Sequence, residues 1–535
     1  MLTKRTARHA LALLVLCLCP APALARDNYP RAADLDALHY RIRLEIKEGS
    51  DEIAADTEIL FAAAADTPRV VALDFGRLTV DAVTEEGGPA EFTRAGEKLN
   101  VALKGTYRRG ERFRIGVRYH GRPADGLLIK RNKFGDFAVF ADNWPNRAHH
   151  WFPSIDHPYD KATSEFFVTA PARFDVVSNG TLVETTSRQD GTRLTHWSER
   201  VPIPVYCMVI GVADFSILHR GEWERVPLSY YLFPKDRDKG VAAFGRAGEM
   251  IEFYTRLIGA FPYEKLALVQ SSTRFGGMEN SSSIFFSEKG IDREGGVEGT
   301  VAHEIAHQWF GDSVTEADWN HLWLSEGFAS YFGALFFEHF DGRDKFLSVM
   351  LAARERYFER STPDFRPIHD PSITDLFKLL NGNNYQKGSW VLHMLRRRVG
   401  DRAFFDGVRD YYRTYRDRNA LTEDFQRIME FHSGQRLEWF FRQWIYQSGH
   451  PVYEASWRWD EPSKQLTLRV RQTQPGPLFR VPLDVEIQTG ATAKLEVVEV
   501  DEREETFTFK LDAKPTSVRV DPDEWVLKVL TLREQ

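Results

Sequence analysis

Residues 303–329 read HEIAHQWFGDSVTEADWNHLWLSEGFA, and this stretch decides what kind of protein the sequence encodes. It begins with His303 and His307, four positions apart. On a helix, side chains with this spacing lie on one face, so both imidazoles can reach one metal ion. Glu304 projects beside that ion and places a carboxylate near a bound water. The stretch predicts a metal site on a helix, and the alternative is an amphipathic helix with one capping and one buried histidine.

A second acidic residue in the same stretch completes a ligand set. Glu326 follows His307 after 18 intervening residues, within the segment 323–329 that is predicted to be helical. Two histidines and one glutamate leave zinc with three protein ligands and an open position, which is typical of catalytic and not of structural zinc sites. We therefore expect His303, His307 and Glu326 to bind one catalytic metal ion.

Two further motifs lie outside this stretch. The first precedes the metal helix and reads Gly276-Gly277-Met278-Glu279-Asn280. Paired glycines let a backbone approach a ligand closely, and Glu279 offers a carboxylate in the same place. The second motif contains Tyr385, whose phenol can stabilise an oxyanion. Both motifs are expected to lie at the cleft that holds the metal.

The pattern of apolar residues divides the chain into three regions. Apolar and polar residues alternate in the first region, as in Tyr40–Ile46, which is typical of half-buried strands. Helical spacing begins near Lys239 and continues to Trp444, and alternating strands return after Pro451. We therefore expect an α+β multidomain protein with an N-terminal β domain (26–216), an α/β catalytic domain (217–449) and a C-terminal β domain (450–535).

One local turn is also expected in the first region. Asn179 and Gly180 lie between two short apolar segments, and both residue types tolerate positive φ, so the pair predicts a β-hairpin turn. Together with Thr181 the pair also forms a glycosylation sequon. The turn explains the two residues without a sugar, and it is the interpretation that we favour.

The first 25 residues predict a signal peptide. Three basic residues precede an apolar run over 10–19, and Ala23 and Ala25 supply the small side chains that a signal peptidase recognises. The alternative is an N-terminal core helix. We expect cleavage after Ala25 and an exported, soluble protein in the periplasm or outside the cell. Cys207 is the only cysteine after residue 25, so such a protein depends on core burial or on a metal for its stability.

Composition excludes several classes of protein. Hydrophobic residues make up 43% of the chain and charged residues 27%, which is far from the composition of disordered chains. The net charge of −7 argues against a general nucleic-acid binder. Beyond residue 25, no segment is apolar over a length that spans a bilayer. We expect a folded protein without nucleic-acid partners and without stable membrane insertion after signal cleavage.

Taken together, these motifs resemble the M1 family of zinc aminopeptidases, which are gluzincins with the pattern HExxH-x18-E preceded by GGMEN. Segment 151–162 is similar to the family's FPCxDEPxxKA element, and 441–451 resembles its exit from the catalytic domain. The resemblance covers nearly the whole chain after residue 25. It implies an N-terminal β saddle, a thermolysin-like α/β catalytic domain and a C-terminal β-sandwich. It also implies a short form that lacks the C-terminal helical domain of longer members.

The resemblance assigns a role to the metal-site residues. His303, His307 and Glu326 would hold one Zn²⁺ per chain, and the ion would lower the pKa of a bound water. Glu304 would act as general base on that water and later pass the proton to the leaving amine. Tyr385 would donate a hydrogen bond to the developing oxyanion.

The resemblance also assigns the substrate. Glu279 would pair with the free α-ammonium of a peptide, and its neighbours Gly276, Gly277, Met278 and Asn280 would complete the substrate-binding segment. The expected protein is an exported zinc aminopeptidase that hydrolyses the N-terminal bond of peptides. The alternatives are a thermolysin-type endopeptidase, an epoxide hydrolase of the same family and an inactive scaffold. The sequence indicates neither the oligomeric state, nor the physiological substrate, nor the preferred N-terminal side chain.

The chain departs from the family at a second amine anchor. Many members supply a Gln or Glu about eight residues before their Phe-Pro pair, and here that position falls on Trp144. An indole is a donor only and cannot accept a hydrogen bond from an ammonium. It can present an aromatic face to the cation, or it can simply pack in the domain interface. A third possibility is that Asp142 turns into the cleft and replaces the anchor.

Overall fold

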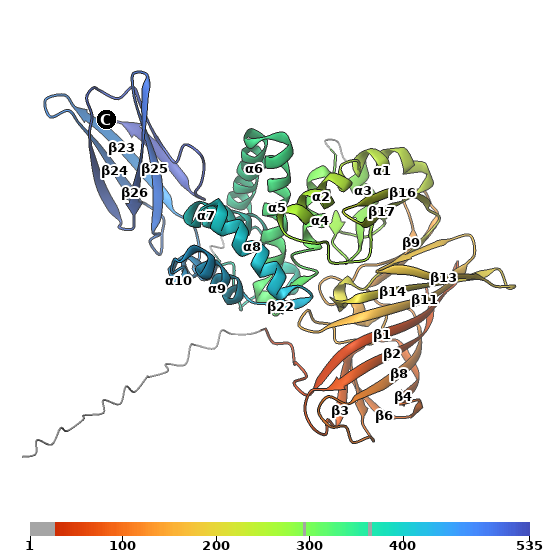
Figure 1. Ribbon diagram of the computed structural model, residues 1–535. Coiled ribbons are helices and arrows are strands. Elements are labelled where there is room, and N and C mark those ends of the chain that lie inside the picture. Colours follow the sequence, from red (N-terminus) through yellow and green to blue (C-terminus); the bar gives the residue numbers. More distant parts are fainter. Residues whose placement is uncertain (1–26, 293–295, 362–365) are drawn as a thin grey trace, which may run out of the picture.

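The computed structural model describes residues 27–292, 296–361 and 366–535, and it consists of three regions in chain order (Figure 1). Strands build the first region, helices dominate the middle one, and a β-sandwich forms the last (Figure 1). This order confirms the predicted fold class. The predicted signal peptide, residues 1–25, lies outside the described residues.

An eight-stranded sheet forms the body of the N-terminal domain. Its strands alternate as the sequence predicts: Tyr40, Ile42 and Leu44 of one strand are buried, while the residues between them reach solvent. That face packs into the hydrophobic core. In spatial order the sheet contains β13 (Thr181–Ser187), β14 (Thr192–Pro204), β11 (Lys161–Pro171), β1 (Leu35–Ile46), β2 (Ile53–Ala63), β8 (Arg112–Gly121), β4 (Thr79–Glu85) and β5 (Gly88–Pro89).

Two smaller sheets complete this domain. One contains β12 (Asp175–Ser178), β15 (Ile210–Ala213), β10 (Phe137–Ala141) and β9 (Leu127–Arg131). The other contains β3 (Val70–Asp74), β7 (Lys98–Ala102) and β6 (Glu91–Ala95). Between β10 and β11 the chain forms a short 3-10 helix, η1 (Ala148–His150). The segment from β10 to η1 leads from the β domain to the interface with the helical domain.

The predicted hairpin at Asn179 and Gly180 is wrong. Strand β12 pairs with β15 and strand β13 pairs with β14, so the two residues connect strands of different sheets. Gly180 does adopt positive φ, at 72°. The Asn179 amide donates to the carbonyl oxygens of Cys207 and Ser281, at 2.8 and 2.6 Å, and the second of these lies in the helical domain. The buried Asn-Gly pair therefore joins domains instead of turning a hairpin.

The middle domain combines a five-stranded sheet with packed helices. Its sheet has the order β16 (Ser216–Trp223), β17 (Val226–Leu232), β18 (Leu266–Ser271), β20 (Ser283–Ser287) and β19 (Gly277–Met278). Its helices are α1 (Arg237–Ala243), α2 (Ala247–Leu257), α3 (Glu288–Ile291), α4 (Glu298–His307), α5 (Trp323–Asp341), α6 (Arg343–Ser361), α7 (Gly388–Val399), α8 (Asp401–Tyr415), α9 (Thr422–Ser433) and α10 (Glu438–Phe441). None of the helices in the described ranges has the length and apolar character needed to cross a membrane.

The C-terminal domain is a sandwich of two antiparallel-rich sheets (Figure 1). Inward-facing residues such as Leu466, Leu468, Val485 and Ile487 are fully buried between them. One sheet contains β27 (Glu504–Lys510), β24 (Gln465–Gln472), β23 (Val452–Asp460) and β29 (Val529–Glu534). The other contains β26 (Thr492–Val500), β25 (Val481–Thr489) and β28 (Ser517–Val520).

Buried polar contacts fix the N-terminal domain against the helical domain. Lys161 Nζ donates to the carbonyl oxygens of Asp312 and Ser313, at 2.8 and 2.7 Å. Arg274 Nε donates to Asp142 at 3.0 Å, across the same interface. Since residues 312 and 313 lie in the segment between helix α4 and strand β21 (Val314–Glu316), these contacts position the β domain close to the histidine-bearing helix.

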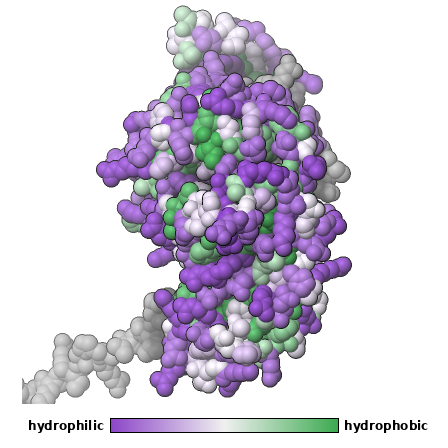
Figure 2. All heavy atoms as spheres, turned by 90° about the vertical axis from the view of Figure 1, so that its right-hand side faces the viewer, coloured by the Kyte–Doolittle hydropathy of each residue, from purple (hydrophilic) through white to green (hydrophobic). Residues whose placement is uncertain are grey.

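The outer face of these two domains is mostly hydrophilic. Figure 2 shows that hydrophobic residues on this face form small, separate groups. Large exposed apolar patches typically mark binding surfaces, and this face shows none among the residues described.

Candidate metal centre and substrate cleft

Helices α4 and α5 bring the predicted ligand set together. The Nε2 atoms of His303 and His307 lie 3.0 Å apart, and each lies 3.2 Å from Oε2 of Glu326. Donor atoms around a tetrahedral zinc at about 2.0 Å from each lie about 3.3 Å apart. The three residues therefore fit a zinc ion, because their donor atoms already converge at nearly that spacing.

Backbone and hydroxyl groups orient the His307 imidazole. Its Nδ1 lies 3.0 Å from the carbonyl oxygen of Phe310 and 3.1 Å from Oγ of Ser325. A carbonyl oxygen only accepts, so Nδ1 carries the proton and the lone pair of Nε2 faces the other two ligands. Such a partner behind a ligating histidine fixes its tautomer and ring direction.

Charge is concentrated where the three ligands meet. Burial opposes protonation of His307, but the surrounding carboxylates, Glu326 first, raise its pKa well above the usual value. Burial and the neighbouring His307 lower the pKa of His303. Burial alone would raise the pKa of Glu326, but the two imidazoles lower it to about 2. The arrangement therefore favours a positive charge between the ligands, as a proton or as a metal ion.

Glu304 lies beside the ligands in the cleft wall. Its side chain is buried, and its carboxylate, that of Glu279 and a nitrogen of His307 lie within 4.8 Å of one another. A side chain on Gly277 would collide with the Glu304 carboxylate. Gly277 thus permits a close approach of the backbone to Glu304, whereas a Cβ on Gly276 would meet nothing within 4 Å, and the predicted approach of the two glycines to a ligand stays a prediction. Burial raises the pKa of Glu304 well above its usual value.

Tyr385 reaches the same centre from a different part of the chain. It lies in η6 (Asn383–Lys387), one turn of π-helix, a feature often found at functional sites. Its hydroxyl donates to Oε1 of Glu326 at 2.5 Å, and its ring stacks on His303 with centroids 5.9 Å apart. The predicted tyrosine therefore contacts two of the three ligands.

A single cleft of about 600 Å³ contains these groups. Glu279 lines it, together with Gly276, Gly277 and Met278. The Glu279 carboxylate is 5% exposed and forms no ion pair with any described residue, while Gln308 holds the Glu279 carbonyl oxygen at 2.6 Å. Burial raises the pKa of the Glu279 carboxyl to about 7, and the nearby Glu326 adds to this rise. Asn280 is buried and lies outside the cleft lining, so its contact with substrate stays a prediction.

Among the described residues of the N-terminal domain, Trp144 is the one that lines the cleft. It is nearly buried, and the rings of Phe275, Trp319 and Phe377 pack edge-on around it at 5.8 to 6.0 Å between centroids. Asp142 does not line the cleft, because Arg147 and Arg274 hold its carboxylate at 2.8 and 3.0 Å. The replacement of the missing anchor by Asp142 is therefore excluded.

Several functional neighbours had no signal in the sequence. Phe310 and Ser325 orient His307 through a carbonyl and a hydroxyl, groups that carry no recognisable spacing. Helix α6 lines the far side of the cleft with Lys345 and Arg356, more than 35 residues beyond His307 in the chain. Only the packing of α5 against α6 places these two basic residues at the cleft.

Family models match most of the chain. The Peptidase M1 N-terminal domain matches residues 36–207, and the Peptidase family M1 domain matches residues 242–444. A probable aminopeptidase 2 from Sulfurisphaera tokodaii is 27% identical over 392 residues, which are 70% of this chain and 49% of that protein. Glutamyl aminopeptidase from Rattus norvegicus is 27% identical over 348 residues, 61% of this chain and 36% of that protein. The chain thus spans about half the length of the first of these relatives and a smaller share of the second.

Solved structures share the fold. An M1 zinc metallopeptidase from Deinococcus radiodurans is 25% identical with a TM-score of 0.66, over 77% of this chain and 93% of that one. A variant of that protein was solved with a Tyr-Ser-Ala substrate. An aminopeptidase A from Legionella pneumophila, in complex with aspartic acid, has a TM-score of 0.81 over 95% of this chain and 61% of that one, at 18% identity. This last likeness concerns the fold alone.

Proposed function

Because the chain belongs to peptidase family M1, we propose that it is a zinc aminopeptidase that removes N-terminal residues from peptides. The observation that carries the proposal is the position of Glu279. Its buried carboxylate, without an ion-pair partner among the described residues, shares one cleft with the His303, His307 and Glu326 set and with Glu304. The α-ammonium is the positive charge that every peptide carries next to its first peptide bond, so this carboxylate would select the first residue of a chain.

The metal site supports hydrolysis. His303, His307 and Glu326 would hold one Zn²⁺, which polarises a carbonyl and makes a bound water acidic at neutral pH. Glu304 would accept the proton of the attacking water and later donate it to the departing amine. Since Glu304 is buried beside the ligands, bulk water competes little with this transfer.

Tyr385 would stabilise the charge that develops on the scissile carbonyl. Its hydroxyl already points to the metal centre, where it donates to Glu326. When a substrate carbonyl oxygen becomes negative, the same hydroxyl can turn to it, and a fixed donor stabilises the developing charge in a water-poor cleft. Tyr385 is thus assigned to the transition state, while Glu279 is assigned to binding.

Glu279 and Trp144 together would form the pocket for the α-ammonium. Glu279 supplies the negative charge, and Trp144 supplies an aromatic wall on the opposite domain. A cation within about 6 Å of an indole face gains roughly 0.5–2 kcal/mol. Such a pocket replaces the second carboxylate or amide anchor by an aromatic group, which makes Glu279 the main determinant of exopeptidase specificity.

The test compares aminoacyl-arylamides with a free amine and their N-acetylated forms. Wild-type protein is expected to cleave only the free-amine substrate. Glu279→Gln should raise KM for that substrate by about tenfold to a hundredfold, because hydrogen bonds to charged groups contribute about 1.5–3 kcal/mol. Glu298→Gln is the matched control, since Glu298 lines the same cleft but pairs with Arg246 at 2.9 Å. Equal cleavage of acetylated substrate by wild-type protein would instead indicate an endopeptidase.

We further propose that the protein is exported. The proposal rests on the basic residues, the apolar run and the small residues of positions 1–25. Expression of the whole chain in a bacterial host and N-terminal sequencing of the secreted or periplasmic product tests it. A new N-terminus at Arg26 is expected, and an intact N-terminus on active protein would contradict the proposal.

A further inference from the structure

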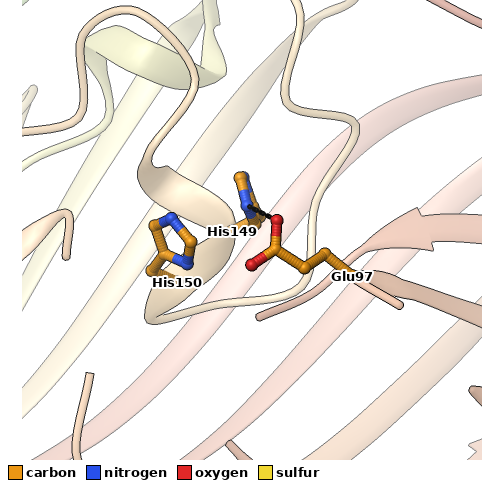
Figure 3. A group of neighbouring side chains, drawn as sticks. All are labelled: Glu97, His149 and His150. Carbon is orange, nitrogen blue, oxygen red and sulfur yellow. Dashed lines mark ion pairs between the residues drawn. The ribbon is translucent and has the colours of Figure 1, made fainter. Parts of the chain in front are cut away.

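A second set of two histidines and one glutamate lies in the N-terminal domain. His149 and His150 end the short helix η1, and Glu97 lies in the turn between β6 and β7. One ligand atom from each of the three lies within 4.8 Å of the others. Figure 3 shows the two imidazoles side by side, with the Glu97 carboxylate facing them from a separate segment. None of the three residues lines the substrate cleft.

His149 is oriented as a metal ligand would be. Its side chain is 10% exposed, and its Nδ1 lies 2.7 Å from Oδ2 of Asp156, an oxygen that also accepts the backbone N–H of His149 at 3.0 Å. The carboxylate accepts, so Nδ1 carries a proton, and Nε2 is the nitrogen available to a metal ion. Nε2 is buried without a hydrogen-bond partner and lies 3.6 Å from the Glu97 carboxylate. A carboxylate behind a histidine in this way is typical of metal sites.

His150 adds a second nitrogen to the same place. Its Nδ1 is also buried without a hydrogen-bond partner, and its ring centroid lies 4.2 Å from that of His149. A Cβ on Gly76 would lie 2.8 Å from this Nδ1. The absence of a side chain at Gly76 therefore leaves room beside the nitrogen.

Charges around the set favour a cation. Asp156 and Glu97 contact His149 directly, and Asp74 lies close enough to act on it. The basic residues nearby have other partners, because Lys98 pairs with Asp74 and Arg94 donates to three backbone carbonyls. The two unpartnered imidazole nitrogens thus lie in a negative environment.

We propose that Glu97, His149 and His150 form a second binding site for a divalent transition-metal ion of the zinc class. Imidazole nitrogens and one carboxylate suit Zn²⁺ and its neighbours, and not the oxygen-binding Mg²⁺ or Ca²⁺. The Glu97 side chain is 53% exposed, so the remaining position faces water. The ion joins the β6–β7 turn to η1 and thereby stabilises the segment that carries Trp144 to the cleft. Its role would be structural, since none of its three ligands lines the substrate cleft.

The first experiment counts metal ions in the full chain. Protein is equilibrated with buffered free zinc, separated from unbound metal and analysed by mass spectrometry for zinc per chain. Wild-type protein is expected to hold two zinc ions, and His150→Gln and Glu97→Gln are expected to hold one. Glu97→Gln is included because its exposed turn position tolerates substitution. His120→Gln is the matched control, since His120 is an exposed histidine beside Asp81, 2.9 Å away, in the same domain.

The second measurement assigns the lost ion to this site. Glu326→Gln should lose the zinc of the cleft and keep the ion that His150→Gln removes, so the double variant should hold none. Asp156→Asn should weaken the second site by about tenfold to a hundredfold, as is usual when the partner of a ligating histidine is removed. Excess zinc should raise the Tm of wild-type protein by more than that of His150→Gln, because a ligand that binds the folded state stabilises it.

The results of these experiments distinguish a failure of the second metal site from a failure of the proposed peptidase function. Peptidase activity of His150→Gln and Glu97→Gln is expected to stay within about twofold of wild type, because neither residue touches the cleft. One zinc per wild-type chain at saturation, or two in both variants, would overturn the second site and leave the aminopeptidase assignment intact. Loss of activity in Glu326→Gln with retention of one zinc would support both.

Discussion

The two sets of two histidines and one glutamate have the same residue types, but they differ in the spacing of their donor atoms, in the elements that carry them and in the exposure of the glutamate. In the cleft, the donor atoms lie 3.0 to 3.2 Å apart on two packed helices. In the N-terminal domain, they lie within 4.8 Å on a 3-10 turn and a hairpin turn, and the carboxylate is half-exposed. The first set has the carboxylate of Glu304 and the phenol of Tyr385 beside it in a cleft of about 600 Å³, whereas the buried carboxylate beside the second set, that of Asp156, already accepts from His149. Both proposed sites use the same ligand types, and the neighbouring groups would decide whether chemistry follows metal binding.

The strongest test of this contrast is to remove the base from the catalytic set. Glu304→Gln keeps the shape of the side chain but cannot accept a proton, so kcat should fall by about 10²–10⁴ while zinc content stays unchanged. The cleft would then resemble the second site, a bound metal without chemistry. Zinc analysis and steady-state kinetics on the same preparation check this. Normal turnover would show that Glu304 is only a helix residue.

Removal of the Tyr385 hydroxyl is expected to have the next largest effect. Tyr385→Phe should lower kcat and kcat/KM by similar factors of about 10²–10³, because the hydroxyl acts on charge present only in the transition state. Zinc content should not change, although the contact to Glu326 is lost. If only KM rises, Tyr385 is a ground-state contact and the contrast between the two sites rests on Glu304 alone.

A smaller effect concerns the burial of charge in the catalytic domain. Lys387 is fully buried, its Nζ lies 3.3 Å from the Gln447 carbonyl oxygen, and burial lowers its pKa to about 7 from an ordinary value of 10.5. Between these two values the unfolded chain holds a proton that the folded chain has released. The free energy of unfolding should therefore rise with pH across this window, by up to roughly 1.4 kcal/mol per pH unit, and the slope should vanish below about 7, where both states hold the proton.

Lys387→Met tests this sign. Urea unfolding at about pH 7 and about pH 9 should show that wild-type protein gains stability relative to the variant on going to the higher pH. At the lower pH the variant should be the more stable of the two, because it buries no charge. Identical pH slopes for the two proteins would mean that Lys387 is solvated in the folded state.

The sequence predicted those parts of the site that depend on local geometry. His303 and His307 share a face because hydrogen bonds between nearby residues set the helical repeat. The order of strand-rich, helical and strand-rich regions follows from the period of the apolar residues. These features are fixed over a few positions, and a pattern in the chain is enough to indicate them.

Only the tertiary structure decided which distant segments meet. Asn179 and Gly180 have the composition of a hairpin turn, but their strands pair with β15 and β14 because those partners cover the core. Arg274, a residue of the helical domain, donates to the Asp142 carboxylate and holds it outside the cleft lining. Glu97 meets His149 across more than 50 positions because a hairpin turn lies against η1. Pairing of this kind depends on packing over the whole fold, and no local spacing records it.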